Sequence, residues 1–178
     1  MTITLAIDTS TSRTSVAIIE DGSILWNGHR DGATEHGPAL PSLVQEGIKG
    51  FAIDDVVVGM GPGPFTGLRV GIAFAQSFAL ARGISVRGVC SLDAIAAQIN
   101  EKDFIVTVDA RRKEVYWARY KDGVRVGQPA VSFPADVAGA PIHSDIYPDM
   151  KALVALIGNI TEPMYLRRPD AVATADRK

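Results

Sequence analysis

The chain has 178 residues, 47% of them hydrophobic, which is enough to bury one large core or two modest ones. Its 18 Lys and Arg residues nearly balance its 20 Asp and Glu residues, so the chain as a whole lacks the strong positive field that attracts nucleic acid. The N-terminus has no basic region and only a short apolar run that meets Asp8, so we expect a cytoplasmic protein with neither a signal peptide nor a membrane span.

The first half of the chain predicts strands that alternate with helices, as in an α/β layer fold. Three short apolar runs, the last two joined by the turn "EDGS", predict an antiparallel three-stranded unit. Two later apolar runs and three segments with helical spacing follow it. We expect strands at residues 3–7, 15–19, 24–29, 54–61 and 84–89, and helices at about 38–49, 66–82 and 91–100, with Thr66 and Ser91 as N-caps of the last two.

The opening layout then recurs in residues 104–127. An apolar strand ending in Asp109, a polar turn, a second strand, an Asp-Gly turn and a third strand follow one another, as they do around Asp8. This favours a duplicated β-β-β-α-β-α unit with a boundary near residue 101, the alternative being a chance match of layout. The second copy is short, and its last elements are a helical run, "MKALVALIG", and an extended run, "PMYLRRPDA".

The glycine-rich stretch "GPGPFTGLRVG", residues 61–71, looks like a phosphate-binding loop but lacks its chemistry. Leu68 and Arg69 follow Gly67, where a P-loop needs a lysine and a hydroxyl, and the prolines remove backbone donors. We therefore predict a rigid turn leading into a packed helix. The hydroxyl-rich turn "TSTSRTS" after Asp8 has no glycine; it either bonds an anion or, as we favour, bonds its own backbone.

The helix predicted over residues 66–82 is apolar nearly all round. Arg69, Gln76 and Ser77 are the polar interruptions between its first and last turns, so the helix must be covered on two sides. One side can pack on a sheet. The other needs either the helix at 38–49 or another protein.

Several of these motifs, in this order and spacing, resemble the TsaB family of bacterial tRNA threonylcarbamoyladenosine biosynthesis proteins. They are "LAIDTST", "GPGPFTGLRVG", "SLDAIAAQ", "VDARRKEVYWARY" and "YLRRPDA". Pro64 and Val70 depart mildly from the family's usual GPGSFTGLRIG. Residues 125–160 match the family poorly and are shorter than its norm.

The resemblance implies an actin-like ATPase-domain (ribonuclease H-like) duplication, with an N-terminal lobe at 1–101 and a shortened C-terminal lobe at 102–178. It also implies a scaffold without catalytic, cofactor or metal residues, which pairs with a TsaD-like catalytic subunit and, through it, a TsaE-like ATPase. tRNA would be reached only indirectly, and the chain alone would be a homodimer. The two helices at 38–49 and 66–82 would form the contact. Its apolar residues are expected to be Leu40, Leu43, Val70, Phe74 and Phe78.

Two other functions remain as alternatives, a small-molecule kinase or ATPase of the same superfamily and a metallopeptidase-like hydrolase. In the catalytic relative, two histidines four residues apart hold part of a metal site, and Ser91 and Ile95 occupy those positions here. Neither side chain can serve as an imidazole ligand. Cys90 is expected to be a buried structural residue, and the basic run "DARRKE" to be either a contact for RNA or a partner, or a solvated turn.

Overall fold

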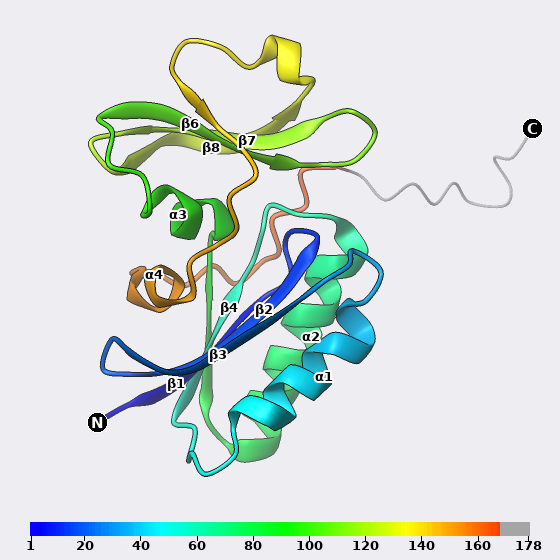
Figure 1. Ribbon diagram of the computed structural model, residues 1–178, viewed down its shortest axis with the longest axis vertical. Helices are drawn as coiled ribbons and strands as arrows, with labels where there is room; N and C mark the ends of the chain where they lie inside the picture. Colours follow the sequence, from blue (N-terminus) through cyan, green and yellow to red (C-terminus); the bar gives the residue numbers. More distant parts are fainter. Residues whose placement is uncertain (168–178) are drawn as a thin grey trace, which may run out of the picture.

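The computed structural model describes residues 1–167, which form two β-sheets, one above the other, with helices between and beside them (Figure 1). The larger sheet has the strand order β3-β2-β1-β4-β5. Its strands are β1 (Ile3–Asp8), β2 (Arg13–Glu20), β3 (Ser23–Asp31), β4 (Asp55–Gly59) and β5 (Ser85–Val89). β2 pairs antiparallel with both β1 and β3, whereas β1, β4 and β5 are parallel. All five predicted strands of the first half are confirmed.

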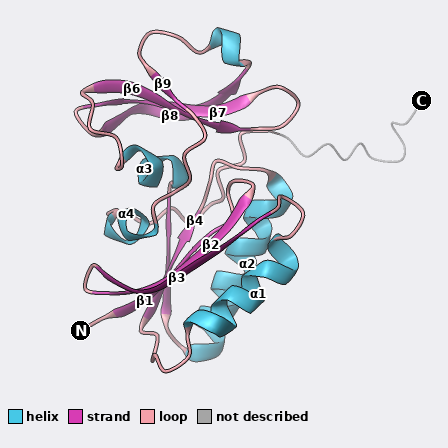
Figure 2. Ribbon diagram, in the orientation of Figure 1, coloured by secondary structure: helices cyan, strands magenta, loops and turns pink. Residues whose placement is uncertain are grey.

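Both faces of the larger sheet are covered because its central strands are apolar on both sides. Leu5 and Ile7 pack beneath α1 (His36–Gly47) and α2 (Phe65–Arg82), whereas Ala6 faces α4 (Met150–Ala155) on the opposite face. Figure 2 shows this arrangement, with α1 and α2 side by side. Gly83, at φ 65°, ends α2 in the left-handed conformation that a glycine reaches without steric cost. The helices predicted over 38–49 and 66–82 and this stop signal are confirmed, whereas the helix predicted over 91–100 ends at Ala96.

The smaller sheet repeats the antiparallel meander of the first. Its order is β8-β7-β6-β9, with β9 parallel to β6. Its strands are β6 (Asp103–Asp109), β7 (Val115–Lys121), β8 (Val124–Ser132) and β9 (Ile142–His143), and α3 (Ser91–Ala96) packs against it. A short 3-10 turn at Pro134–Asp136 is the helical element between β8 and β9 in the described chain. The second unit is therefore abridged, as predicted.

Two predicted N-caps are wrong. Pro64 occupies the cap position of α2, so Thr66 lies inside the helix. Cys90 occupies the cap position of α3, and the hydroxyl of Ser91 instead donates to Asp8 Oδ2 at 2.6 Å. A hydrogen bond to a carboxylate is stronger than one between neutral groups, so this long-range contact prevails over the local capping pattern.

Each sheet is covered by one helix that lies on the other side of residue 101 in the sequence. α3 precedes residue 101 yet packs on the second sheet, whereas α4 follows it and covers the first. After α4 the chain returns along β5, where the Ile160 amide donates to Gly88 O at 2.8 Å. Residues 163–167 of the predicted extended run form neither strand nor helix, and the rest of that run lies outside the described residues. The boundary at residue 101 stays a sequence-based prediction.

No helix within residues 1–167 is long and apolar enough to cross a membrane.

Candidate functional site

Asp8, at the end of β1, is the centre of a buried hydrogen-bond network. Its side chain accepts hydrogen bonds from the hydroxyl of Ser91 at 2.6 Å, and from the hydroxyl and amide of Ser10 at 2.7 and 2.9 Å. Only 1% of Asp8 is exposed. Burial raises the pKa of Asp8 above its ordinary value, although the hydrogen bonds from Ser91 and Ser10 oppose the shift. Asp8 therefore ties β1 to α3 and does not face an open pocket.

The glycine-rich loop packs directly on the turn that follows Asp8. A side chain on Gly63 would collide with the backbone of Ser10, and one on Gly67 would lie 2.9 Å from the carbonyl oxygen of Thr9. The hydroxyl of Thr9 in turn donates to Gly67 O at 2.7 Å. The loop is thus packed backbone against backbone on this turn, in line with the prediction of a rigid turn.

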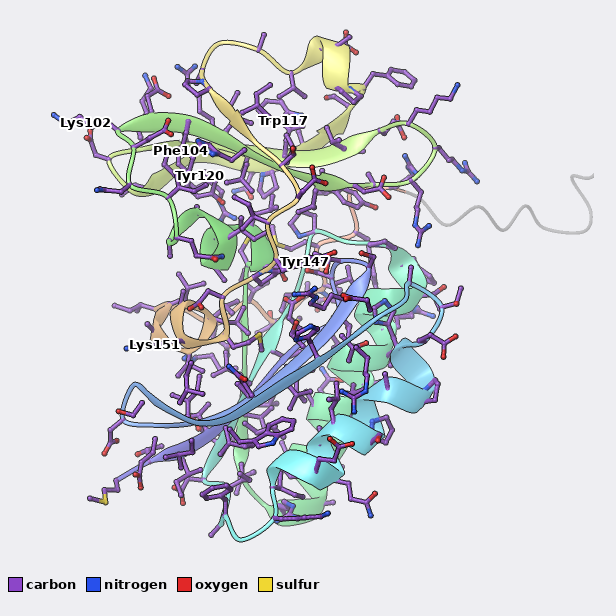
Figure 3. All side chains as sticks on the ribbon, in the orientation of Figure 1. Lys102, Phe104, Trp117, Tyr120, Tyr147 and Lys151 are labelled. Atoms are coloured by element: carbon purple, nitrogen blue, oxygen red, sulfur yellow. The ribbon has the colours of Figure 1, made fainter. Side chains whose placement is uncertain are left out.

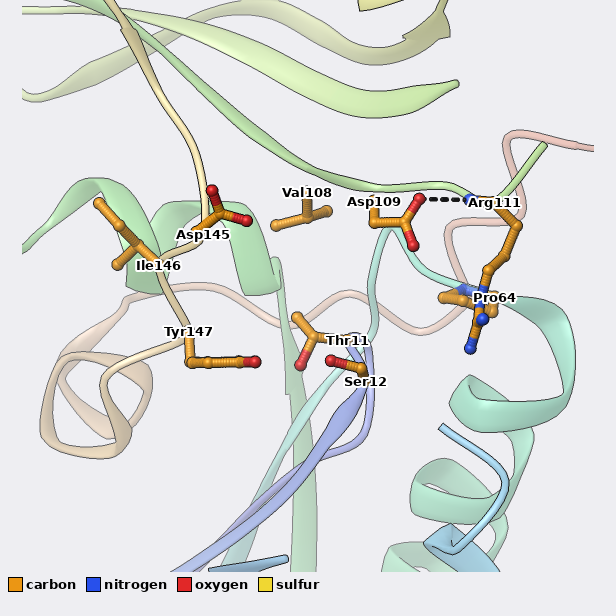
Figure 4. A pocket seen from close by; sticks show the side chains of 9 residues that line it. All are labelled: Thr11, Ser12, Pro64, Val108, Asp109, Arg111, Asp145, Ile146 and Tyr147. Atoms are coloured by element: carbon orange, nitrogen blue, oxygen red, sulfur yellow. Dashed lines mark hydrogen bonds between the residues drawn. The ribbon is translucent and has the colours of Figure 1, made fainter. Parts of the chain in front are cut away.

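A small pocket lies between the two sheets, at the level of the Asp8 and Asp109 turns (Figure 4). Its volume is about 80 Å³, far below the roughly 300 to 1,000 Å³ of typical small-molecule sites. It is lined by Thr11, Ser12, Pro64, Val108, Asp109, Arg111, Asp145, Ile146 and Tyr147. The guanidinium of Arg13 stacks over the ring of Tyr147 at 3.9 Å and fixes one wall. This pocket alone is too small for a nucleotide, and an open hollow of about 510 Å³ adjoins it and shares Asp145, Ile146 and Tyr147.

The positions compared with metal-binding histidines are buried in the fold. Ser91 is 1% exposed and bonded to Asp8, and Ile95 lies in the core beneath the second sheet. His36 is also buried, with its Nδ1 2.7 Å from the hydroxyl of Thr14, and burial lowers its pKa. Among residues 1–167, no group of three His, Cys, Asp or Glu side chains is gathered as metal ligands would be.

The five residues predicted at a partner contact divide into two groups. Leu40 and Leu43 are 0% exposed and belong to the core under α1, so their side chains are not available to a partner in this structure. Val70, Phe74 and Phe78 are half-buried and follow one another at four-residue spacing along α2. The rings of Phe74 and Phe78 stack at 6.1 Å. The surface stripe on α2 therefore consists of Val70, Phe74 and Phe78, and we call it the α2 stripe.

An aromatic cluster at the first turn of α2 was not found by sequence reasoning. The ring of Phe65 lies 4.8 Å from that of Tyr165, and the guanidinium of Arg69 lies over Phe65 at 4.1 Å. Arg69 Nε also donates to the hydroxyl of Tyr165 at 3.3 Å. This cluster fastens the C-terminal segment to the beginning of α2.

Comparison with known proteins identifies a matching family model and several relatives of this chain. The family model for TsaD, tRNA N6-adenosine threonylcarbamoyltransferase, matches residues 33–166. An uncharacterized protein of Mycobacterium tuberculosis is 41% identical over 196 residues, covering 94% of this chain and 92% of that protein. The tRNA threonylcarbamoyladenosine biosynthesis protein TsaB of Escherichia coli is 37% identical over 127 residues, covering 66% of this chain and 54% of that protein.

Solved structures agree with these relatives. A Pseudomonas aeruginosa protein described as similar to peptidase YeaZ superposes with a TM-score of 0.80 at 26% identity, covering 94% of this chain and 100% of that one. YeaZ of the same organism gives a TM-score of 0.74 at 26% identity, covering 87% and 90% of the two chains. The predicted fold class, an actin-like α/β duplication, is confirmed. The chain spans 58% of a Mycobacterium leprae relative and about half of the E. coli TsaB protein.

Proposed function

Because the chain belongs to the TsaB family of tRNA threonylcarbamoyladenosine biosynthesis proteins, we propose that it is a non-catalytic scaffold subunit that pairs with a TsaD-like catalytic subunit. A TsaE-like ATPase would join through that subunit. A complex that modifies tRNA works where tRNA is processed, so we assign the chain to the cytoplasm.

The α2 stripe is the observation that carries this proposal. Val70, Phe74 and Phe78 lie half-buried in a line on the helix, and they are apolar surface that a partner can cover. The chain also matches the family model of the catalytic subunit. Two chains of similar fold can meet through equivalent helices around an approximate two-fold axis, and the same contact would give a homodimer of this chain alone.

The apolar surface that the α2 stripe can bury sets the expected strength of the pairing. Burying a fully exposed Val or Phe side chain is worth roughly 1.5 to 3 kcal/mol, and the three side chains of the α2 stripe are already partly covered. Association costs at least about 4 kcal/mol. The stripe therefore supports a pairing of modest strength, to which polar residues around it must contribute.

The surroundings of Asp8 support the non-catalytic part of the proposal. Asp8, at the end of the first strand, is enclosed by hydroxyl donors of its own chain and does not face a pocket. This observation favours a scaffold over the kinase alternative.

The test of this proposal is Phe74→Glu, with Leu80→Glu as a matched control. Leu80 is on the same helix and 84% exposed, outside the α2 stripe. We expect Phe74→Glu to abolish pairing with the catalytic subunit and self-association, because it places a carboxylate in a desolvated contact. Leu80→Glu should leave both unchanged.

Pairing is measured by pull-down with the catalytic subunit and by sedimentation equilibrium, with circular dichroism to establish folding. If folded Phe74→Glu protein pairs as well as the wild type, the α2 stripe is not the interface and the proposal fails.

A further inference from the structure

A basic surface lies beside the aromatic cluster, at the mouth of the inter-lobe pocket. It combines the turn between β6 and β7, the first turns of α2 and the C-terminal segment. We call it the basic ridge, and its cations are Arg69, Arg111, Arg112, Lys113 and Arg167.

Polar and ring contacts join these three segments into one surface. Arg167 Nη1 donates to the carbonyl oxygen of Ala110 at 3.1 Å, and Arg167 also forms an ion pair with Glu114. Two residues earlier, Tyr165 contacts Arg69 and Phe65. Figure 4 shows Arg111 beside Pro64, just before α2 begins. Cations from both lobes therefore meet at one end of the molecule.

The turn that carries three of the cations has an unusual and fixed backbone. Arg111, Arg112 and Lys113 have φ values of 65°, 54° and 64°, in the left-handed region. The Asp109 side chain accepts a hydrogen bond from the Arg111 amide at 2.8 Å, and the Ala110 amide donates to Glu114 O at 2.9 Å. All three basic side chains are exposed. Hydrogen bonds to its backbone therefore hold the turn in place, and its three basic side chains lie at the surface.

Four carboxylates lie near this end of the molecule, and Asp109, Asp145 and Glu162 are exposed. Glu114 is paired with Arg167, and Asp109 accepts the Arg111 amide. Asp145 lines the pocket on the side of Ile146 and Tyr147. The exposed cations of the ridge outnumber these exposed carboxylates by four to three, although the whole chain has a net charge of −2.

We propose that the basic ridge binds the phosphate backbone of RNA directly, with Arg69, Arg111 and Lys113 as phosphate contacts. The proposal rests on the proposed function, which brings tRNA to the complex, and it departs from the expectation that tRNA is reached only through the partner. Exposed cations beside aromatic rings are the combination that RNA-binding surfaces use, since the cations hold phosphates and the rings accept stacked bases. Phe65 and Tyr165 lie half-buried at the edge of the ridge, where their rings contact each other and Arg69 lies over Phe65.

The test compares Arg111→Gln/Lys113→Gln with Lys102→Gln/Lys151→Gln in the full-length chain. The first pair removes two charges from the basic ridge. Lys102 precedes β6, at the opposite end of that strand from the turn, and Lys151 lies on α4 (Figure 3). Both control lysines are exposed, so the two variants lose the same charge.

Binding is measured by fluorescence anisotropy with a labelled, unmodified tRNA transcript over a series of salt concentrations. Each phosphate contact in single-stranded RNA contributes a slope of about −0.7 to the logarithmic salt dependence, which is about fivefold in affinity at roughly 0.1 M salt. The ridge variant should therefore bind about 25-fold more weakly, with a salt slope smaller by about 1.4. The control variant should bind as the wild type does.

Three outcomes overturn the proposal. These are no measurable binding of the wild-type chain at low salt, equal losses in both variants, or unchanged RNA binding in the ridge variant. Unchanged RNA binding together with loss of pairing would identify the basic ridge as a contact for an acidic protein surface. Because RNA binding is measured on the chain alone, it stands apart from the pairing assay. Failed RNA binding with intact pairing removes this inference and leaves the scaffold proposal in place.

Discussion

The two turns that follow Asp8 and Asp109 share a local geometry and differ in their surroundings. Each aspartate ends the first strand of its meander, and each accepts a hydrogen bond from the amide two residues later, Ser10 at 2.9 Å and Arg111 at 2.8 Å. Asp8, however, is 1% exposed and also bonded by two hydroxyls, whereas Asp109 is exposed at the inter-lobe pocket. The same pattern of strand, Asp and turn is buried and bonded to α3 in the first lobe, and it lies at the surface in the second.

The difference arises from what packs on each turn. The glycine-rich loop and α3 enclose the Asp8 turn, so hydroxyls replace water around the carboxylate. No comparable loop follows β6 and β7 among the described residues, and the basic turn at 111–113 remains at the surface. The two copies thus share the amide bond to the aspartate and differ in the rest of the turn, since residues 111–113 have positive φ values and lie at the surface.

The largest expected effect separates Asp8→Ala from Asp109→Ala. Removing the Asp8 carboxylate leaves the buried hydroxyls of Ser10 and Ser91 without their acceptor, so we expect a loss of about 3 kcal/mol in the free energy of unfolding. Asp109→Ala exposes an amide to water and should cost less than about 1 kcal/mol. Urea unfolding followed by circular dichroism measures both. Equal losses would mean that burial does not distinguish the two turns.

A somewhat smaller effect is expected from Gly59→Ala. A methyl group at residue 59 would overlap the carboxylate of Asp8 and lie 2.5 Å from the hydroxyl of Ser91. The resulting displacement should cost about 2 kcal/mol. Gly37→Ala is the control, since a methyl group there would meet nothing within 4 Å and the position is helical. It should be neutral or stabilising by up to about 1 kcal/mol. Thermal unfolding of both variants provides the measurement, and an unaffected Gly59→Ala protein would contradict the packing described around Asp8.

Sequence patterns predicted the elements well because they depend on local order. Apolar runs, the Asp-Gly turns and Gly83 act within a few residues, and the structure confirms the strands and helices that they indicated. The two N-caps were wrong for the opposite reason. Ser91 bonds Asp8, which is 83 positions away in the chain, and no local pattern reports on that contact.

The candidate site was less predictable than the fold for the same reason. The resemblance to the TsaB family named the two helices as the contact, and Leu40 and Leu43 were chosen beside Phe74 for their apolar spacing. That spacing does not tell a side chain that faces its own sheet from one that faces a partner. The contact between Phe65 and Tyr165 joins residues 100 positions apart. The basic run "DARRKE" was visible in the sequence, and its position next to the aromatic cluster was not.

The pH dependence of stability should have opposite signs at Asp8 and Asp103. The pKa of Asp8 is raised by burial, so its stabilising contribution is complete below its ordinary pKa and is lost as pH rises through the raised value. Hydrogen bonds from Arg119 lower the pKa of Asp103, so its contribution is present above the ordinary pKa and is lost as pH falls through the lowered value. The midpoint difference between wild type and Asp8→Asn should thus grow on acidification from neutral pH toward about pH 4.

The matching difference for Asp103→Asn should shrink as the pH falls below about 4. Thermal unfolding between acid and neutral pH gives both curves. Slopes of the same sign would show that burial does not govern the titration of Asp8.

The smallest expected effect is a change in the reactivity of Cys90, which adjoins Ser91. Cys90 is 2% exposed, and burial raises the pKa of its thiol to about 12, so a thiol reagent can modify it only when the chain opens locally. Weakening the bond between Asp8 and Ser91 should favour that opening. If Asp8→Asn lowers the opening free energy by about 1 kcal/mol, labelling becomes about fivefold faster. Asp109→Asn should leave the rate unchanged, because the Asp109 side chain is exposed and bonds the Arg111 amide of its own turn. Labelling kinetics under native conditions, compared with the fully unfolded protein, measure the effect. Equal acceleration by both variants would indicate that opening follows the stability of the whole chain, and that Asp8 does not hold the beginning of α3 in particular.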